Sequence, residues 1–342
     1  MSEIRKDPVT GRWVVFSPER LRRPIQYNFH PADDGKEVED PFIEGREAFT
    51  PPEVFAIRDP GSAPNGPGWK VRVVPNRFPA LRVEGELNKE AVGFYDKMNA
   101  IGAHEVVIET PKPDLELEQQ PLENVVLVLK AYRARIVDLM RDLRFRYLLP
   151  FKNVGVFAGA SIRHPHSQII ALPVVPVNMK DKVDASSLYF AQKDRNLFED
   201  ILRAEIKSGE RLVFENAGYA VFCPFACRFP FEVCIMPKQQ RADFHLCTDH
   251  ELVLLADILK KILMAYRIGL ERPSYNLILH TAPIRRGGSE DGAATEFDFR
   301  WHIEILPRLS GIAGFEFGTG FYINPVFPEV AARFLKEVKT DD

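Results

Sequence analysis

Apolar and polar positions along the chain follow two periods, one typical of helices and one typical of strands. Over residues 122–146, apolar side chains recur at steps of three and four residues, which predicts an amphipathic helix. A second helix is predicted over residues 250–268. Short runs rich in valine, isoleucine and aromatic residues predict strands, at 13–16, 71–74, 105–108, 154–157, 168–172, 231–237, 275–279 and 301–307.

The order of these elements occurs twice. Residues 231–237 resemble residues 104–111, and residues 301–307 resemble residues 167–173, so the chain is interpreted as two copies of a strand, strand, helix, strand, strand unit. This order predicts an α+β fold of antiparallel sheets with helices packed on one face. We place the two halves at residues 1–175 and 176–342. Aligning Pro173 with Pro307 puts Arg300 in the place of His166, which predicts a degenerate second half.

The amino-acid composition limits the kinds of partner that we expect the protein to bind. The 342 residues include 45 Lys and Arg against 48 Asp and Glu, a net charge of −3 without long runs of one sign. We therefore expect neither nucleic acid nor a membrane surface as partner. No apolar stretch approaches the ~20 residues that cross a bilayer, and the N-terminus lacks the apolar core of a signal peptide, so we expect a cytoplasmic protein. The four cysteines, all between residues 223 and 247, are expected to be free thiols in the core.

The most informative motif is His164-Pro165-His166-Ser167-Gln168, which leads directly into an apolar strand. In an extended segment residues i and i+2 point to the same side, so His164, His166 and Gln168 can present three polar groups in a row. The preceding residues 153–161 supply an amide, glycines and a serine, which allow close backbone approach to a ligand. This combination suits a phosphate. Two other interpretations stay open: hydrogen-bonded surface histidines at the start of a strand, and a pair of metal ligands.

The motif resembles the signature of the histidine-triad superfamily, and within it the galactose-1-phosphate uridylyltransferase family. Hydrolases of the superfamily carry a third histidine where this chain has Gln168. The resemblance extends over most of the chain, through residues 7–13, 74–81, 151–153 and 314–325. It implies two histidine-triad-like halves and a homodimer in which the neighbour's C-terminal segment completes the site.

The resemblance also implies a double displacement. His166 is then the nucleophile that forms a covalent nucleotidyl-imidazole, with its other ring nitrogen held by the carbonyl of His164, and Gln168 and Ser161 hold the phosphoryl oxygens. Nucleotide-binding roles are implied for Asn76, Arg77, Phe151, Asn153, Gly159, Arg20 and Arg23. Roles at the sugar or acceptor are implied for Phe315, Phe317 and Thr319. For the arginines, a solvated basic surface is an equally good interpretation.

The chain departs from the family where relatives bind metals. A structural zinc in many relatives uses a Cys-x-x-Cys pair, a downstream histidine and the first histidine of the motif. Here Asp40 and Ile43 stand in the place of the cysteines and Thr110 precedes the place of the downstream histidine, so we expect no zinc and no other cofactor. A second, iron-type site in some relatives resembles His280, His302 and Glu304, but Glu304 stands where a histidine would be, so satisfied polar residues are the favoured interpretation.

The chain also departs from the family at the tail residues that would contact the sugar. In well-known uridylyltransferases the tail presents Lys, Tyr and Glu to the hexose, whereas Gly314, Thr319 and Gly320 stand here. The first hypothesis is a transferase of the UDP-glucose and hexose 1-phosphate uridylyltransferase type, and the second is an ADP-glucose phosphorylase that transfers AMP to inorganic phosphate. Gln168 argues against a dinucleotide hydrolase. A non-catalytic nucleotide-binding protein would have no reason to keep His166.

Overall fold

The structure is a computed structural model that describes residues 2–22, 39–286 and 298–340. Ten of its strands form one continuous antiparallel sheet. From one edge to the other they are β10 (Leu212–Glu215), β11 (Tyr219–Phe222), β12 (Val233–Pro237), β14 (His302–Pro307), β13 (Tyr275–His280), β8 (Tyr147–Val154), β9 (His166–Leu172), β7 (Ala103–Ile108), β4 (Trp69–Pro75) and β3 (Phe55–Arg58).

The sheet is built from two copies of the same unit. The first half of the chain supplies β3, β4, β7, β9 and β8 in that spatial order, and the second half supplies β10, β11, β12, β14 and β13. The copies meet at the antiparallel pair β8 and β13, where Asn153 lies opposite Asn276. The sheet order is therefore the same when counted inward from either edge, which confirms the duplicated α+β architecture. The boundary after residue 175 falls between β9 and the following helix, and it stays a prediction.

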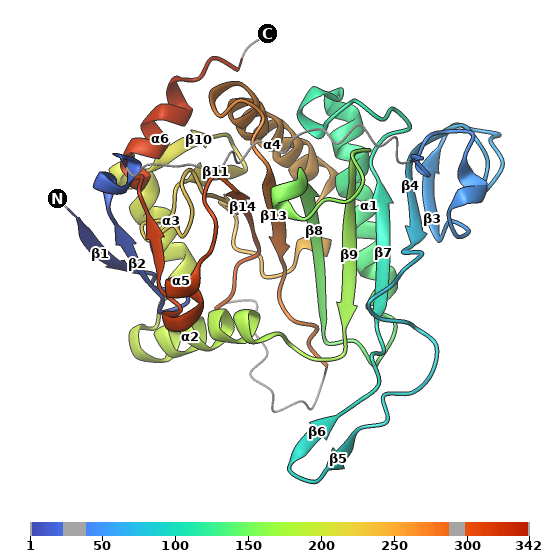
Figure 1. Cartoon of the computed structure of the whole chain (residues 1–342), viewed down its shortest axis with the longest axis horizontal. Helices are drawn as coiled ribbons and strands as arrows, with labels where there is room; N and C mark the ends of the chain where they lie inside the picture. The colour runs from blue at the N-terminus through green and yellow to red at the C-terminus, as the bar shows by residue number, and fades with distance from the viewer. Residues whose placement is uncertain (1, 23–38, 287–297, 341–342) are drawn as a thin grey trace.

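Both predicted helices are present and lie on the same face of the sheet (Figure 1). Helix α1 (Leu122–Leu139) joins β7 to β8, and α4 (Asp249–Gly269) joins β12 to β13. Helix α1 ends before residue 146 because Asp142 accepts the backbone N–H of Arg144 and begins a turn. Thr248 and Glu251 form a capping box that starts α4. One large apolar core lies between these helices and the sheet, and includes Val107, Ile169, Leu255, Leu277 and Ile303.

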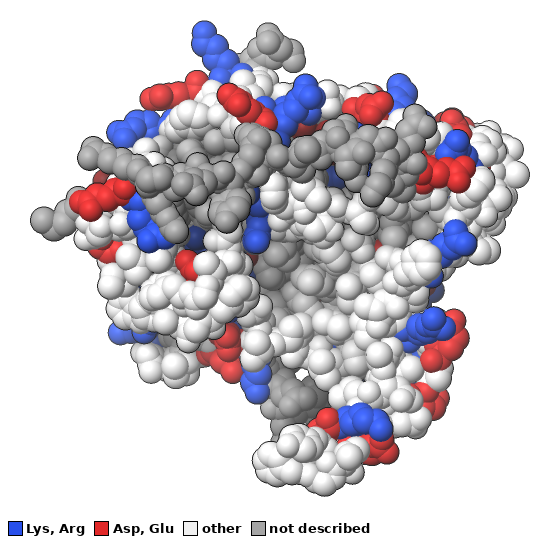
Figure 2. Space-filling model, in the orientation of Figure 1, with Lys and Arg blue, Asp and Glu red and all other residues white. Residues whose placement is uncertain are grey.

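The opposite face of the sheet is covered unevenly. Helices α2 (Val177–Lys193) and α3 (Leu197–Ser208), which the sequence interpretation did not include, connect the halves and pack on the second half. Met179 and Phe198 contribute to a core with Phe222 and Met236 on that side. Among the described residues, loops rather than helices pack on the same face of the first half. Figure 2 shows this face hollowed near the middle of the molecule, over the central strands.

The strand predicted over residues 154–157 is wrong. Strand β8 ends at Val154 because Gly155 adopts a positive φ of 80°, a conformation that only glycine takes up easily. The next residues form the 3-10 turn η4 (Val156–Ala158). Other short 3-10 turns are η1 (Pro18–Arg22), η2 (Glu47–Phe49), η3 (Leu117–Gln119) and η5 (Phe244–Leu246).

Smaller elements surround the main sheet. A three-stranded sheet contains β1 (Glu3–Lys6), β2 (Trp13–Phe16) and β15 (Tyr322–Asn324), followed by α6 (Pro328–Glu337). The hairpin of β5 (Glu90–Val92) and β6 (Tyr95–Lys97) projects away from the body (Figure 1). All four cysteines are buried and free, as predicted. Over the described residues, none of the helices combines the length and apolar character needed to cross a bilayer.

Candidate functional site

His166 is the first residue of β9, on the sheet face that loops cover. Its Nδ1 lies 2.7 Å from the carbonyl oxygen of His164, and because a carbonyl only accepts, Nδ1 carries the proton. Burial lowers the pKa of His166 below its usual value of 6.5, and it outweighs the opposite effect of this hydrogen bond. The ring is therefore neutral at pH 7, with the lone pair on Nε2. A neutral imidazole with a defined tautomer is the form that attacks phosphorus.

His164 is held from both ends of its ring. Nδ1 lies 2.8 Å from Oδ2 of Asp40, and Nε2 lies 2.7 Å from the carbonyl oxygen of Thr110. A carbonyl oxygen only accepts, so Nε2 donates to Thr110, while Nδ1 faces the carboxyl group of Asp40. Phe42 packs edge-on against both His164 and His166. The carbonyl that orients His166 thus belongs to an anchored, buried residue.

This arrangement does not fit the zinc site that the resemblance implies. Both ring nitrogens of His164 are engaged by oxygen atoms of Asp40 and Thr110, so neither is open to a metal. Of the residues that replace the cysteines, Asp40 hydrogen-bonds to His164 and isoleucine offers no ligand atom. These hydrogen bonds occupy the position that the resemblance gives to the metal, and we expect no zinc there.

Gln168, the second polar residue of β9 on this face, is oriented by the neighbouring strand β7. The backbone N–H of Ala80 donates to Nδ1 of His104, so the proton of the neutral His104 ring is on Nε2. Nε2 lies 2.6 Å from Oε1 of Gln168 and donates to it. The amide nitrogen of Asn76 lies 3.2 Å from the same Nε2, but both groups are donors in this tautomer, so this contact adds no hydrogen bond. With its oxygen engaged, Gln168 keeps its NH₂ group for a ligand.

Asn153 lies near the end of β8 and is oriented from the second half of the chain. Nδ2 of Asn276 donates to Oδ1 of Asn153 at 2.8 Å and to the carbonyl oxygen of Ala158 at 2.9 Å. The Asn153 NH₂ group is therefore the end left for a ligand. Gly155 allows the close contact between the halves, because a Cβ at this position would lie 2.2 Å from Oγ of Ser274.

A buried ion pair supports the strands from the helix-covered face. Nζ of Lys152 lies 2.8 Å from Oε2 of Glu109 and 3.3 Å from the carbonyl oxygen of His166. Both side chains are almost completely buried. The pair therefore ties β8 to the segment after β7 and to the backbone of His166 itself.

The other predicted nucleotide-site residues are placed as follows. Phe151 lies opposite Gln168 in the pairing of β8 with β9. Gly159, with φ of 85°, and Ser161 are exposed in the loop before β9. Arg77 is exposed beside Phe78 and lines a shallow pocket of about 340 Å³ with Thr50 and Pro51. Arg20 is exposed in η1, and Arg23 lies outside the described residues.

The structure does not bring the predicted sugar residues to His166 within one chain. Phe315, Phe317 and Thr319 belong to α5 (Gly314–Thr319), and none of the three is buried. This helix contacts β15 and lies at the other side of the molecule from β9 (Figure 1). Phe317 is 79% exposed.

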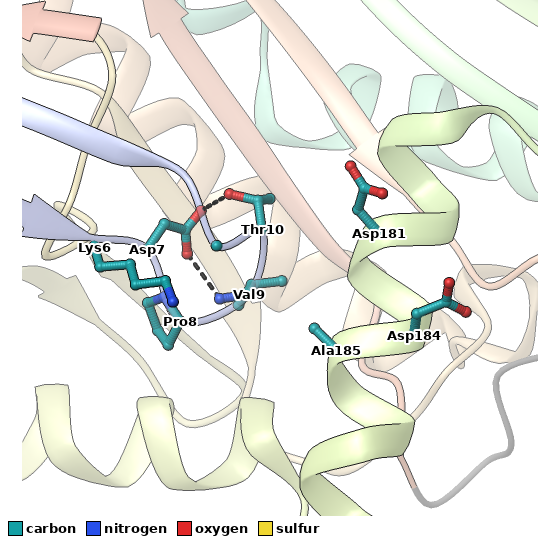
Figure 3. A pocket seen from close by; sticks show the side chains of 9 residues that line it. Lys6, Asp7, Pro8, Val9, Thr10, Asp181, Asp184 and Ala185 are labelled. Atoms are coloured by element: carbon teal, nitrogen blue, oxygen red, sulfur yellow. Dashed lines mark hydrogen bonds between the residues drawn. The ribbon is translucent and has the colours of Figure 1, made fainter. Parts of the chain in front are cut away.

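A separate pocket of about 440 Å³ lies between the β1–β2 turn and α2 (Figure 3). Asp7 accepts the backbone N–H of Val9 and the hydroxyl of Thr10, which shapes one wall. Asp181 and Asp184 of α2 form the other wall. It contains none of the histidines of the motif, and we assign it no chemistry.

The second half holds a group of side chains that corresponds to the site. His302 is the first residue of β14, and its Nδ1 lies 2.9 Å from the carbonyl oxygen of Arg300, as His166 relates to His164. The alignment of Arg300 with His166 is therefore wrong, and His302 is the structural counterpart. In the strand pairing, Ile278 opposes Glu304 as Phe151 opposes Gln168. His302, Glu304 and His280 thus stand where the first half has His166, Gln168 and Asn153.

Several site residues escaped the sequence interpretation. His104 lies one residue before a predicted strand, and Asn276 lies inside another. Their shared signal is a polar side chain within an apolar run, which marks a residue worth examining. It does not reveal the partner, which depends on strand pairing.

Comparisons with known proteins found relatives that match almost the whole chain. A model of the N-terminal domain of galactose-1-phosphate uridyl transferase matches residues 1–176, and a domain of unknown function matches residues 122–340. The chain is 36% identical to the ADP-glucose phosphorylase of Arabidopsis thaliana, over 98% of this chain and 93% of that protein. It is 28% identical to the galactose-1-phosphate uridylyltransferase of Thermotoga maritima over 100% of both chains.

Solved structures show the same relationships. The Arabidopsis thaliana ADP-glucose phosphorylase with bound ADP-glucose has a TM-score of 0.83 and 35% identity, with 99% of each chain covered. A uridylyltransferase has a TM-score of 0.74 and 30% identity, with 98% of this chain and 97% of that chain covered.

Proposed function

The chain belongs to the galactose-1-phosphate uridyl transferase family of nucleotidyltransferases, and on this basis we propose that it transfers a nucleoside monophosphate from a nucleotide sugar through a covalent intermediate on His166. The observation that carries the proposal is the hydrogen bond of His166 Nδ1 to the His164 carbonyl, which leaves Nε2 as a nucleophile. The lowered pKa of His166 keeps that nitrogen unprotonated at neutral pH.

In the first displacement, Nε2 of His166 attacks the α-phosphorus of the nucleotide sugar. A P–N bond forms while the bond from the α-phosphorus to the bridging oxygen breaks, and the sugar 1-phosphate leaves with the electron pair. The ring then carries a positive charge, which the His164 carbonyl stabilises at Nδ1–H. In the second displacement a phosphate oxygen of the acceptor attacks the same phosphorus, the P–N bond breaks, and neutral His166 is regenerated.

The site supplies donors for the charge that develops on the phosphoryl oxygens. The Gln168 NH₂ group is available because its oxygen accepts from His104, and the exposed hydroxyl of Ser161 is the second donor in the proposal. Neutral donors of this kind stabilise a transition state without binding the product as tightly as a cation would. Asn153, oriented by Asn276, binds the nucleotide in the same proposal.

Of the two substrate pairs, we propose ADP-glucose with inorganic phosphate as the first candidate. Identity to the ADP-glucose phosphorylase is 36%, against 28% to the Thermotoga maritima uridylyltransferase, and the TM-scores of 0.83 and 0.74 rank the same way. Gly314, Thr319 and Gly320 also replace the hexose-binding side chains of well-known uridylyltransferases. UDP-glucose with a hexose 1-phosphate is the second candidate, supported by the family model itself.

We further propose a homodimer. Phe315 and Phe317 are exposed on α5, which Figure 1 shows apart from β9, the strand that His166 begins, so in this proposal a neighbouring chain presents them to the sugar. Size-exclusion chromatography with light scattering tests this point, and a monomer at working concentration would remove it. The cytoplasmic location stays a prediction.

The chemical step is tested by intact-protein mass spectrometry after incubation with ADP-glucose or UDP-glucose without acceptor. We expect an AMP-sized adduct with ADP-glucose on the peptide that contains His166, and none in H166G. H250A removes an exposed histidine of α4 and is the matched control that should still be labelled. A UMP-sized adduct alone would favour the uridylyltransferase. Binding of both nucleotide sugars without any adduct would refute the covalent mechanism.

A further inference from the structure

His280, His302 and Glu304 form a compact group of metal-type ligands in the second half. One ligand atom from each residue lies within 4.8 Å of the others. His280 Nε2 is 3.5 Å from Oε2 of Glu304, and the two imidazole rings lie 4.9 Å apart between centroids. Two histidines and one carboxylate are a common ligand set for zinc and for non-haem iron.

A lysine from α2 contacts two members of this group. Nζ of Lys182 lies 2.8 Å from Nε2 of His302 and 2.5 Å from Oε1 of Glu304. An ammonium only donates, so Nε2 of His302 accepts, which agrees with the proton of that ring being on Nδ1 toward the Arg300 carbonyl. The lone pair that could bind a metal, or attack phosphorus as in His166, is therefore already used.

The charges around the group already balance. Arg228 contacts both Glu304 and Glu232, so two cations, Lys182 and Arg228, face two carboxylates. An added divalent cation would leave two buried positive charges without counterions.

His280 approaches Glu304 at 3.5 Å without the geometry of a hydrogen bond. Both ring nitrogens of His280 are buried and make no hydrogen bond. A ring nitrogen of His280 would act as a ligand if a metal ion replaced the ammonium. The cluster therefore has three ligands in place and one obstacle, the Lys182 side chain.

We propose that Lys182 is a built-in cation that closes the second-half counterpart of the active site, so that the cluster binds no metal ion in this protein. Replacing Lys182 by a neutral residue converts His280, His302 and Glu304 into a site for a divalent transition metal. The geometry of the cluster is independent of the transfer activity, so this inference holds even if the proposed function fails.

The test measures metal content rather than activity. The wild-type chain and the variants K182M and K182Q are treated with EDTA, incubated with Zn²⁺ or, without oxygen, Fe²⁺, then desalted and analysed by mass spectrometry for metals. K180M changes an exposed lysine of the same helix and serves as control. We expect about one metal ion per chain in the two Lys182 variants and no stoichiometric metal in wild type, K180M or K182M/H302A.

A second readout is the midpoint of thermal unfolding. Zn²⁺ should raise it in K182M and K182Q and leave it unchanged in wild type. A wild-type chain that keeps one metal ion per chain, lost in H302A, would overturn the proposal. So would a Lys182 variant that is folded by circular dichroism and takes up no metal. K182Q keeps a polar side chain, so it provides this test if K182M does not fold.

Discussion

The chemistry of His166 depends on which of its two ring nitrogens carries the proton. The carbonyl of His164 fixes the proton on Nδ1, and His164 is itself anchored through Asp40 and Thr110. A chain of hydrogen bonds therefore sets the direction of the attacking lone pair before any substrate arrives. Preorganisation of this kind lowers the barrier because the nucleophile loses little further freedom in the reaction.

The rate of adduct formation should follow the protonation of His166. Its pKa is lowered from 6.5 by burial, so the reactive neutral form predominates at pH 7 and is lost only as the pH falls through that lowered value. The single-turnover rate with ADP-glucose should be level around neutral pH and should decrease about tenfold per pH unit once the pH is below the pKa. Rapid-quench measurement from pH 5 to 8 checks this. A midpoint above 6.5 would contradict the burial argument.

His104 should act as a positioning residue for Gln168. Its Nε2–H engages Oε1 of Gln168, so in H104A the amide is free to rotate and its NH₂ group is no longer directed at the phosphoryl oxygens. We expect kcat to fall by up to about 10²-fold with a small change in KM, because the donor acts mainly in the transition state. H104Q keeps a donor and should recover part of the rate.

The control for His104 is H245A, which removes a histidine in η5. A merely structural role for His104 would lower the unfolding midpoint and raise KM together, and H104Q would then give no rescue of kcat. That pattern would reject the positioning role.

Site residues are predictable from the sequence where their arrangement depends only on neighbouring positions in the chain. His166 and Gln168 lie two residues apart in one strand, so their common orientation follows from the period of a strand. His104 and Asp40 contact the motif across 64 and 124 residues, and Asn276 contacts Asn153 across 123 residues. Only the pairing of strands and the path of loops bring them together, and no local pattern encodes that.

Among the elements, β8 and β9 carry the site, and the pair of Lys152 and Glu109 holds them from behind. K152M should leave the Glu109 carboxylate buried without its cation, at a loss of about 3–5 kcal/mol in the free energy of unfolding. Urea denaturation followed by circular dichroism measures this loss. The double variant K152M/E109L removes both charges and should be more stable than K152M. A double variant that is as unstable as K152M would show that packing rather than charge explains the effect.

The elements that sequence reasoning missed have physical explanations. Helix α2 buries Met179, Lys182, Val183 and Ser186, which follow the helical spacing of three and four residues. Because two of these four buried side chains are polar, the apolar stripe is interrupted and the helix is hidden. Helices α1 and α4 bury almost uninterrupted apolar stripes, so both were predictable. The error at residues 154–157 came from Gly155, whose positive φ ends a strand in the middle of an apolar run.

At the scale of the whole molecule, duplication explains both the site and its closed counterpart. Each half begins β9 or β14 with a histidine bound to a carbonyl two residues earlier. Helices α2 and α3 cover that face only in the second half, so His166 is partly exposed whereas His302 is buried and contacts Lys182. The repeat was visible in the sequence. The sequence did not show that both copies share one sheet, because this depends on the pairing of β8 with β13.

This pairing couples the halves, and Asn276 tests the coupling. The residue belongs to the second half but donates to Asn153 and to the carbonyl of Ala158. N276A leaves the Asn153 amide free to rotate and removes the hydrogen bond to the loop that precedes β9. Loss of about 1–1.5 kcal/mol of binding corresponds to a KM for the nucleotide sugar raised about tenfold, with kcat nearly unchanged.

Replacing Asn153 itself gives the complementary test. N153A should give a similar increase in KM, and the double variant N153A/N276A should be no worse than N153A, because Asn276 acts on the nucleotide through Asn153. Additive effects in this cycle would mean that Asn276 contacts the ligand directly or supports the fold independently. Steady-state kinetics of the four proteins, with thermal unfolding midpoints to exclude a loss of stability, therefore decide whether the second half is a passive support or helps to orient the nucleotide.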